Sequence, residues 1–214
     1  MRSCLLVEEK TVPPVTRQFV TALTAAACMM ATADAHEIWI FRDLAARPER
    51  AALPHHFVKA EAAMQVKSIS ISAGGEIPKR ETCQGADLSP QLAWSGAPAN
   101  PQSFALILDD PDAPGGTFTH WLVWNIPAAA QELPENLPKI AQLPGGASQG
   151  RNDFGNIGYG GPCPPPGKAH RYYFRLFALD TALNLKPGAG RRELERAMEG
   201  HILARGELMG RFAR

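Results

Sequence analysis

Long apolar runs dominate the pattern of hydrophobic and polar positions, and each predicts a β-strand. The first spans residues 103–109 and includes the unbroken apolar stretch Phe104 to Leu108. The second extends from His120 to Ile126, and the third, Arg171 to Leu179, places aromatic or aliphatic side chains on both of its faces. Runs of this length are typical of strands buried on both faces, so a sheet is predicted at the centre of the fold.

Weaker patterns precede and separate these runs. Residues 65–72 alternate in polarity, which predicts a strand whose isoleucine face, with Ile69 and Ile71, is buried. Residues 77–94 have the proline and glycine content of a loop, and 134–146 predict a long connection with little regular structure. Connections of that length in compact domains are often functional.

The C-terminal part changes period. Apolar side chains recur at helical spacing from Arg191 to Ala204, which predicts a helix stopped by Gly206 and followed by a strand over 207–212. The chain is therefore predicted to be β-rich with one late helix. Its strands do not alternate regularly with helices, which argues against a doubly wound parallel sheet.

Composition narrows the classes of partner. The chain has 214 residues, 45% hydrophobic and 20% charged, which suits one globular domain with a real core. A formal net charge of +1 lacks the basic excess that nonspecific binding to nucleic acid or an anionic membrane requires. The 19 glycines and 19 prolines favour strands joined by ordered loops over a helical bundle.

The N-terminus has the form of an export signal. Arg17 precedes an apolar segment over 19–33, and the small residues around Ala35 predict cleavage there, with no membrane-spanning segment in the mature chain. We therefore expect a signal peptide over 1–35, an extension over 36–64, a main domain over 65–214, and a periplasmic or secreted protein. The alternative is a buried or disordered N-terminal segment.

Cysteine usage agrees with export. Cys4 and Cys28 would leave with the signal peptide, while Cys83 and Cys163 would remain as an even pair in an oxidising compartment. A disulfide between the remaining two would pin the glycine-rich loop that contains Cys163. Two separate buried thiols are the alternative, because sequence does not give their separation.

Candidate binding residues lie where the apolar runs begin and end. Asp110 and Asp112 lie in a proline-stiffened turn directly after the first run, where carboxylates either cap turn amides or orient a histidine. His120 and His170 each begin an apolar run, so two strands can present both rings at one end of a sheet. Residues 158–167 hold four glycines and four prolines, which predicts a rigid loop whose amides can approach a ligand.

These motifs together resemble the phosphatidylethanolamine-binding protein family, which includes the Raf-kinase-inhibitor proteins, and in particular its bacterial YbhB/YbcL branch. The resemblance covers about residues 69–212. It is carried by Asp110 to Pro114, by His120 before Trp-Leu-Val-Trp-Asn, and by the Gly-Pro to His170-Arg-Tyr172 segment.

The resemblance implies a mostly β fold: a β-sandwich built on a large central antiparallel sheet, with a C-terminal helix. It also implies a small cavity for phosphate, phosphorylethanolamine or similar anions, lined or shaped by Asp110, Asp112, Pro114, His120, Gly161, Pro165 (or Pro164), His170 and Tyr172. Thr119 stands where eukaryotic relatives have a second histidine, a departure that bears on ligand preference.

These observations predict a non-catalytic protein that needs no cofactor and binds a small anionic or zwitterionic phosphoryl ligand. Both histidines and loop amides near Gly161 would donate to its phosphoryl oxygens. The main alternative is an extracytoplasmic interaction module that inhibits a protease or a kinase-like partner. Two metal hypotheses also remain: a facial triad of His120, His170 and an aspartate, and a copper chelate at His36 if cleavage exposes it.

Overall fold

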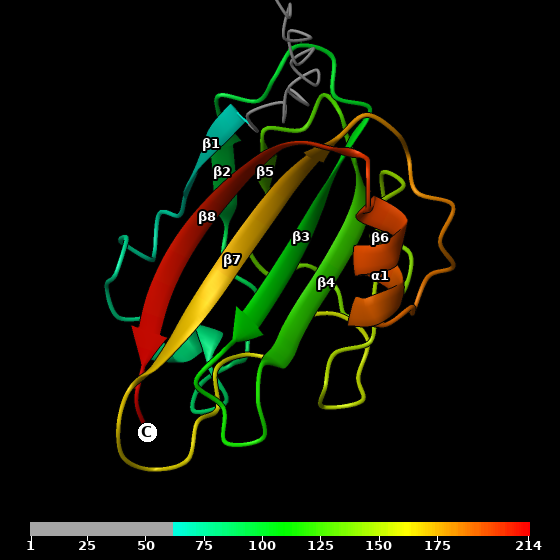
Figure 1. Cartoon of the computed structure of the whole chain (residues 1–214). Helices are drawn as coiled ribbons and strands as arrows, with labels where there is room; N and C mark the ends of the chain where they lie inside the picture. Colours follow the sequence, from blue (N-terminus) through cyan, green and yellow to red (C-terminus); the bar gives the residue numbers. More distant parts are fainter. Residues whose placement is uncertain (1–61) are drawn as a thin grey trace, which may run out of the picture. The chain divides into compact units, whose positions relative to one another are not determined.

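The computed structural model describes residues 62–214. The order of elements is β1 (Ala62–Lys67), the 3-10 helix η1 (Lys79–Glu81), β2 (Leu92–Ser95), β3 (Ser103–Asp110), β4 (Phe118–Pro127), β5 (Glu132–Leu133), β6 (Ser148–Gln149), β7 (His170–Leu179), α1 (Arg191–Met198) and β8 (Ile202–Phe212). The strands form one eight-stranded sheet in the order β5-β2-β1-β8-β7-β3-β4-β6 (Figure 1). The predicted signal peptide, its cleavage site and the copper chelate at His36 lie outside the described residues.

The central strands are buried on both faces, as their apolar runs predict. Along β3, Leu106 and Leu108 enter one hydrophobic cluster, whereas Ala105 and Ile107 enter a second cluster on the opposite face. This division follows from the alternation of side chains along a strand. The second cluster also contains Leu194 and Met198 of α1, so the helix covers that face of the sheet (Figure 1).

The first cluster is enclosed because the sheet curls. In the hydrogen-bonded order β2 and β3 are separated by three strands. Even so, the rings of Trp94 on β2 and Phe104 on β3 lie 5.3 Å apart. The β1, β2 and β5 end of the sheet therefore packs over the β3 end, giving the two-layered arrangement of a sandwich from one continuous sheet.

One strand direction differs from the prediction of an antiparallel sheet. β1 pairs with β8 in parallel, with Ala62 opposite Ala204 and Gln65 opposite Glu207, while β7 and β8 are antiparallel. The sheet is therefore mixed. The antiparallel sheet was implied by the family resemblance; side-chain periodicity identifies a strand but carries no information on the direction of its neighbour, so it could not indicate this one parallel pair.

The predicted helix over 191–204 is wrong at its C-terminal end. α1 ends at Met198, Gly200 adopts φ +80°, and β8 begins at Ile202. Gly206 does not end the helix as predicted from the sequence, but lies within β8. A Cβ at this position would approach the Met64 carbonyl oxygen to 2.7 Å. Close packing of β1 against β8 explains this glycine better than a helix stop does.

The first strand differs from its prediction in its bounds and in the exposure of Ile69, while Ile71 is buried as predicted. β1 ends at Lys67 and buries Met64 and Val66, whereas Ile69 is 83% exposed beyond the strand and Ile71 is buried in the following turn region. The segment predicted as a loop over 77–94 ends in strand β2, which is short and half-buried and gives little apolar signal. Within residues 62–214, no helix has the length and hydrophobicity to cross a membrane.

Candidate functional site

The end of β3 fixes the orientation of His170. Asp110 is the last residue of β3, and its carboxylate oxygen Oδ1 accepts the backbone N–H of Asp112 at 2.8 Å, which closes the turn. Its other oxygen, Oδ2, lies 2.7 Å from Nδ1 of His170, the first residue of β7. Nδ1–H donates to this carboxylate, so Nε2 is the ring nitrogen that remains for a ligand.

The His120 ring is fixed by a backbone carbonyl. His120 lies near the start of β4 and is 3% exposed. Its Nδ1 lies 2.7 Å from the carbonyl oxygen of Gly160, an acceptor only, so Nδ1 carries the proton. Burial lowers the pKa of His120 below the ordinary value of a histidine. The ring is therefore neutral at pH 7, and its Nε2 presents a lone pair.

Aromatic side chains surround the His120 ring. Ring centroids lie 5.1 Å away for Phe118, 5.3 Å for Phe154 and 5.2 Å for Tyr172, the last two edge-on. The Tyr172 hydroxyl is buried close to the Asp110 carboxylate, and no hydrogen bond of standard geometry joins it to a described residue. Burial, and then the negative charge of Asp110, raise the pKa of Tyr172, so its hydroxyl stays protonated and can donate to a ligand.

The two histidines lie on one face of the sheet. His170 and Tyr172 are two positions apart on β7, and side chains at that spacing point to the same face. The His120 ring contacts Tyr172 from β4, and Asp110 of β3 lies between these strands in the sheet order. The segments that carry Asp110, His120, His170 and Tyr172 thus meet at one end of three adjacent strands.

Comparison with known proteins places the chain in a family. The family model described as phosphatidylethanolamine-binding protein matches residues 67–213. The chain belongs to the phosphatidylethanolamine-binding protein family. A UPF0098 protein of Pyrococcus horikoshii is 52% identical over 158 residues, covering 72% of this chain and 79% of that protein. A UPF0098 protein of Methanothermobacter thermautotrophicus is 50% identical over 151 residues, covering 71% and 99%.

Solved structures of family members have the same fold. A putative phosphatidylethanolamine-binding protein homologue from Chlamydia trachomatis has a TM-score of 0.65 and 42% identity, covering 71% of this chain and 98% of its own. YbcL of E. coli, described as a member of the mammalian family, has a TM-score of 0.67 and 37% identity, with the same coverages. The chain therefore lies in the bacterial and archaeal UPF0098 and YbcL-like branch.

Two residues predicted to bind the ligand have other partners in this family member. The Asp112 carboxylate accepts hydrogen bonds from the backbone N–H of Arg171 at 2.9 Å and from its guanidinium at 2.6 and 2.8 Å. The Arg171 guanidinium holds the pKa of Asp112 well below its usual range. The Gly161 N–H, expected to face a phosphoryl oxygen, donates instead to Asp87 Oδ1 at 2.6 Å.

The predicted prolines have different surroundings. Pro114 and Pro165 are exposed, whereas Pro164 is buried. Of the alternatives Pro164 and Pro165, only the former is therefore part of the packed loop.

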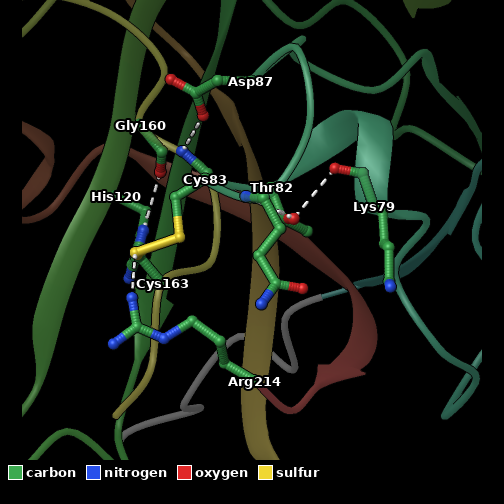
Figure 2. Close-up of a disulfide and its surroundings, with 10 residues drawn as sticks. Lys79, Thr82, Cys83, Asp87, His120, Gly160, Cys163 and Arg214 are labelled. Atoms are coloured by element: carbon green, nitrogen blue, oxygen red, sulfur yellow. Dashed lines mark hydrogen bonds between the residues drawn. A yellow bond between two sulfur atoms is a disulfide. The ribbon is translucent and has the colours of Figure 1, made fainter. Parts of the chain in front are cut away.

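The structure joins Cys83 to Cys163 in a disulfide, with the two Cα atoms 5.4 Å apart. Figure 2 shows the bridge beside the Gly160 carbonyl and the His120 ring. The loop that holds Cys163 therefore touches both the bridge and the histidine.

Sequence reasoning missed two residues of this region. Asp87 clamps Gly161 and forms an ion pair with Lys139. The Asp87 backbone has φ +55°, a conformation that aspartate tolerates better than most residues, so an aspartate there is compatible with a turn. Its contact with Gly161 was not predictable from the sequence, because the two residues are 74 positions apart. Phe154, 44% exposed, covers His120 from a loop without periodicity. An isolated phenylalanine there carries no recognisable signal.

A cavity of about 610 Å³ adjoins the His120 site. Its lining residues include Phe154, Gly160 and Gly161 together with both bridged cysteines. Among the predicted ligand-binding residues, only Gly161 lines it. Phe154 and Gly160 both line this cavity and both contact the buried imidazole.

Within residues 62–214, histidine, cysteine, aspartate and glutamate side chains form no group of three or more that could hold a metal ion. The facial-triad hypothesis requires such a group of His120, His170 and an aspartate. Asp110 instead contacts one of these histidines through a direct hydrogen bond.

Proposed function

We propose that this family member is a non-catalytic binding protein whose ligand is a small phosphoryl compound of the phosphate or phosphorylethanolamine type. One observation carries the proposal: His120 and His170, on one face of the sheet, both use Nδ1 within the protein. Each keeps Nε2 for a ligand, and groups of the protein itself hold both rings in position. Such preorganisation lowers the entropic cost of binding.

The protonation state of His120 changes the expected direction of its hydrogen bond. The sequence suggests that both histidines donate to phosphoryl oxygens. Neutral His120, with Nδ1–H committed to Gly160, accepts at Nε2 instead. The ligand must therefore offer a proton at that point, either the P–OH of a monoanionic phosphoryl group or the ammonium of a zwitterion. The buried Tyr172 hydroxyl supplies a donor beside it.

The chemistry around the histidines supports binding rather than turnover. In residues 62–214, the described partners of the two rings are a carbonyl oxygen, a carboxylate and aromatic rings. None of these is an activated hydroxyl or thiol nucleophile. Export to the periplasm or outside the cell remains our proposal from the N-terminal pattern.

A second candidate function is an interaction module that docks a protein target. Phe154 is 44% exposed and lines the cavity together with Lys139, and Ile140, the next residue, is 48% exposed. Exposed apolar side chains at the mouth of a cavity favour protein contacts. An exported protease or a kinase-like protein would be the partner class.

Calorimetric titration of phosphorylethanolamine at pH 7 tests the first proposal. We expect His120→Ala to weaken binding by about tenfold or more, the loss equivalent to one strong hydrogen bond. His201→Ala is the matched control, because this histidine is exposed and pairs with Asp180 away from the site. Equal affinity of wild type and His120→Ala would refute the assignment, and an inert wild type would favour the interaction module.

A further inference from the structure

The disulfide belongs to a clasp between two loops. Residues 159–163 are attached to residues 81–87 by the Tyr159 hydroxyl, which donates to the Glu81 carbonyl at 2.6 Å, and by the Cys83 N–H, which donates to the Pro162 carbonyl at 3.2 Å. The Gly161 N–H donates to Asp87, and the Cys83–Cys163 bridge is the covalent member. All four links hold one short loop.

This loop controls the proton on His120. The Gly160 carbonyl lies inside it and accepts from Nδ1, while the Gly160 N–H donates to the His120 carbonyl at 3.0 Å. A shift of the loop away from β4 removes the acceptor that fixes the proton on Nδ1. The neutral ring then exchanges between its two tautomers, and Nε2 is no longer a permanent acceptor.

The bridge is open to attack by a thiol. Cys83 is exposed, Cys163 is half-buried, and both line the cavity of about 610 Å³. The Arg214 guanidinium nitrogen Nη1 lies 3.6 Å from Sγ of Cys163 (Figure 2). A cation at that position stabilises a thiolate, so the sulfur of Cys163 is the better leaving group.

We propose that Cys83–Cys163 is a reducible disulfide whose co-reactant is a dithiol, and that its reduction weakens ligand binding by releasing the Gly160 carbonyl from His120. The second half rests on the proposed function; the first half does not. The bridge is thus a modification site that positions His120 and makes binding depend on the redox state of the compartment.

The exchange balances without any further reactant. A thiolate of the dithiol attacks Sγ of Cys83, the bond between the two protein sulfurs breaks, and Cys163 leaves as a thiolate beside Arg214. The second thiol of the reagent then attacks the mixed disulfide. The reagent is oxidised to its own disulfide, while Cys83 and Cys163 each gain one electron and end with one proton.

The bridge lies outside the hydrophobic core. Neither hydrophobic cluster contains Cys83 or Cys163. The noncovalent links from Tyr159 and Asp87 remain after reduction, so the loop loosens without leaving the surface. Reduction therefore removes no core contact, and its proposed effect on binding acts through the local position of Gly160; any loss of global stability from the released 80-residue loop is a separate effect.

The test uses the full chain with Cys4→Ser and Cys28→Ser, so that only the pair of interest remains. Protein is treated with dithiothreitol or left oxidised, and phosphorylethanolamine is titrated onto each form. We expect affinity to fall by about fivefold or more on reduction, equivalent to about 1 kcal/mol. Cys83→Ser with Cys163→Ser should match the reduced form and be unaffected by dithiothreitol.

Nitrogen-15 NMR of the His120 ring measures which ring nitrogen carries the proton, and it needs no ligand. Oxidised protein should show the proton on Nδ1, and reduced protein an exchanging pair of tautomers. Unchanged tautomer and affinity on reduction would overturn the proposal. So would loss of the dispersed resonances of Trp121 and Trp124, because the bridge would then be a structural staple.

Failure of the proposed function can be distinguished from failure of the redox proposal. If neither form binds phosphorylethanolamine but the tautomer responds to reduction, the proposed ligand is wrong and the redox coupling stands.

Arg214→Gln tests the role of the cation. It should slow reduction by dithiothreitol several-fold, whereas Arg192→Gln, an exposed arginine on α1, should not. Equal rates would remove Arg214 from the mechanism.

Discussion

Buried, neutral His120 should make the free energy of unfolding fall as the pH is lowered. Its pKa is lower in the folded protein than in the unfolded chain, because burial disfavours the imidazolium. Below the unfolded pKa of about 6.5, the unfolded chain therefore binds more protons than the folded protein. The stabilising contribution is fully present well above this pH and is lost progressively as pH falls toward the folded pKa.

The magnitude follows from linkage. Between pH 7.5 and 5.5 an unfolded histidine takes up nearly one proton, while folded His120, whose pKa is lowered, takes up less. The free energy of unfolding then falls by at most about 1.4 kcal/mol from this residue over that interval. His120→Gln removes the titration and keeps an amide donor for the Gly160 carbonyl, so the variant should lack this part of the pH dependence.

Urea unfolding followed by the fluorescence of Trp121 and Trp124, both fully buried, measures the effect without ligand. The difference between wild type and His120→Gln isolates one histidine from the carboxylates that titrate in both proteins. His201→Gln keeps the buried imidazole and should follow the wild type more closely. Parallel stability curves for wild type and His120→Gln would show that the folded ring takes up a proton freely, and the neutral-acceptor argument would fail.

Two other substitutions probe the site and the sheet. Gly160→Ala places a Cβ 2.7 Å from the Phe154 ring and should displace this ring from His120. Phosphorylethanolamine binding measured by calorimetry should weaken about three- to tenfold. Gly115→Ala is the control, because its Cβ meets open space and the variant should bind as wild type does. Arg175→Met removes one of the two arginine partners of the fully buried Asp109 carboxylate, while Arg191 remains as the other. It should lower the free energy of unfolding by about 1 to 2 kcal/mol in urea denaturation, while exposed Arg192→Met should have little effect.

Much of the candidate site was predictable because its residues adjoin long apolar runs and proline-containing turns, which can be recognised in the sequence. Asp110 and His170 adjoin the apolar runs that become β3 and β7, and Asp-Pro turns end strands by fixing the backbone. The hydrogen bond between them joins residues 60 positions apart, which the sequence order alone does not give. The family resemblance implied that both residues line one cavity, but it did not give the hydrogen bond between them.

The sequence by itself determined the central strands, the late helix and the identity of the reactive side chains. Periodicity and turn chemistry are local properties, readable over a few residues. Tertiary structure decided the parallel pairing of β1 with β8, the curl that encloses the first cluster, and the clamp of Asp87 on Gly161.

The proton on His120 also depends on tertiary structure. Its place on Nδ1 follows from a carbonyl 40 residues away, brought close by a loop that a disulfide and three hydrogen bonds hold. Either nitrogen of a neutral histidine ring can carry the proton, and a hydrogen-bonding neighbour decides which of them does. Only the packed fold supplies this neighbour, so the chemistry that the ring offers a ligand is a property of the folded protein.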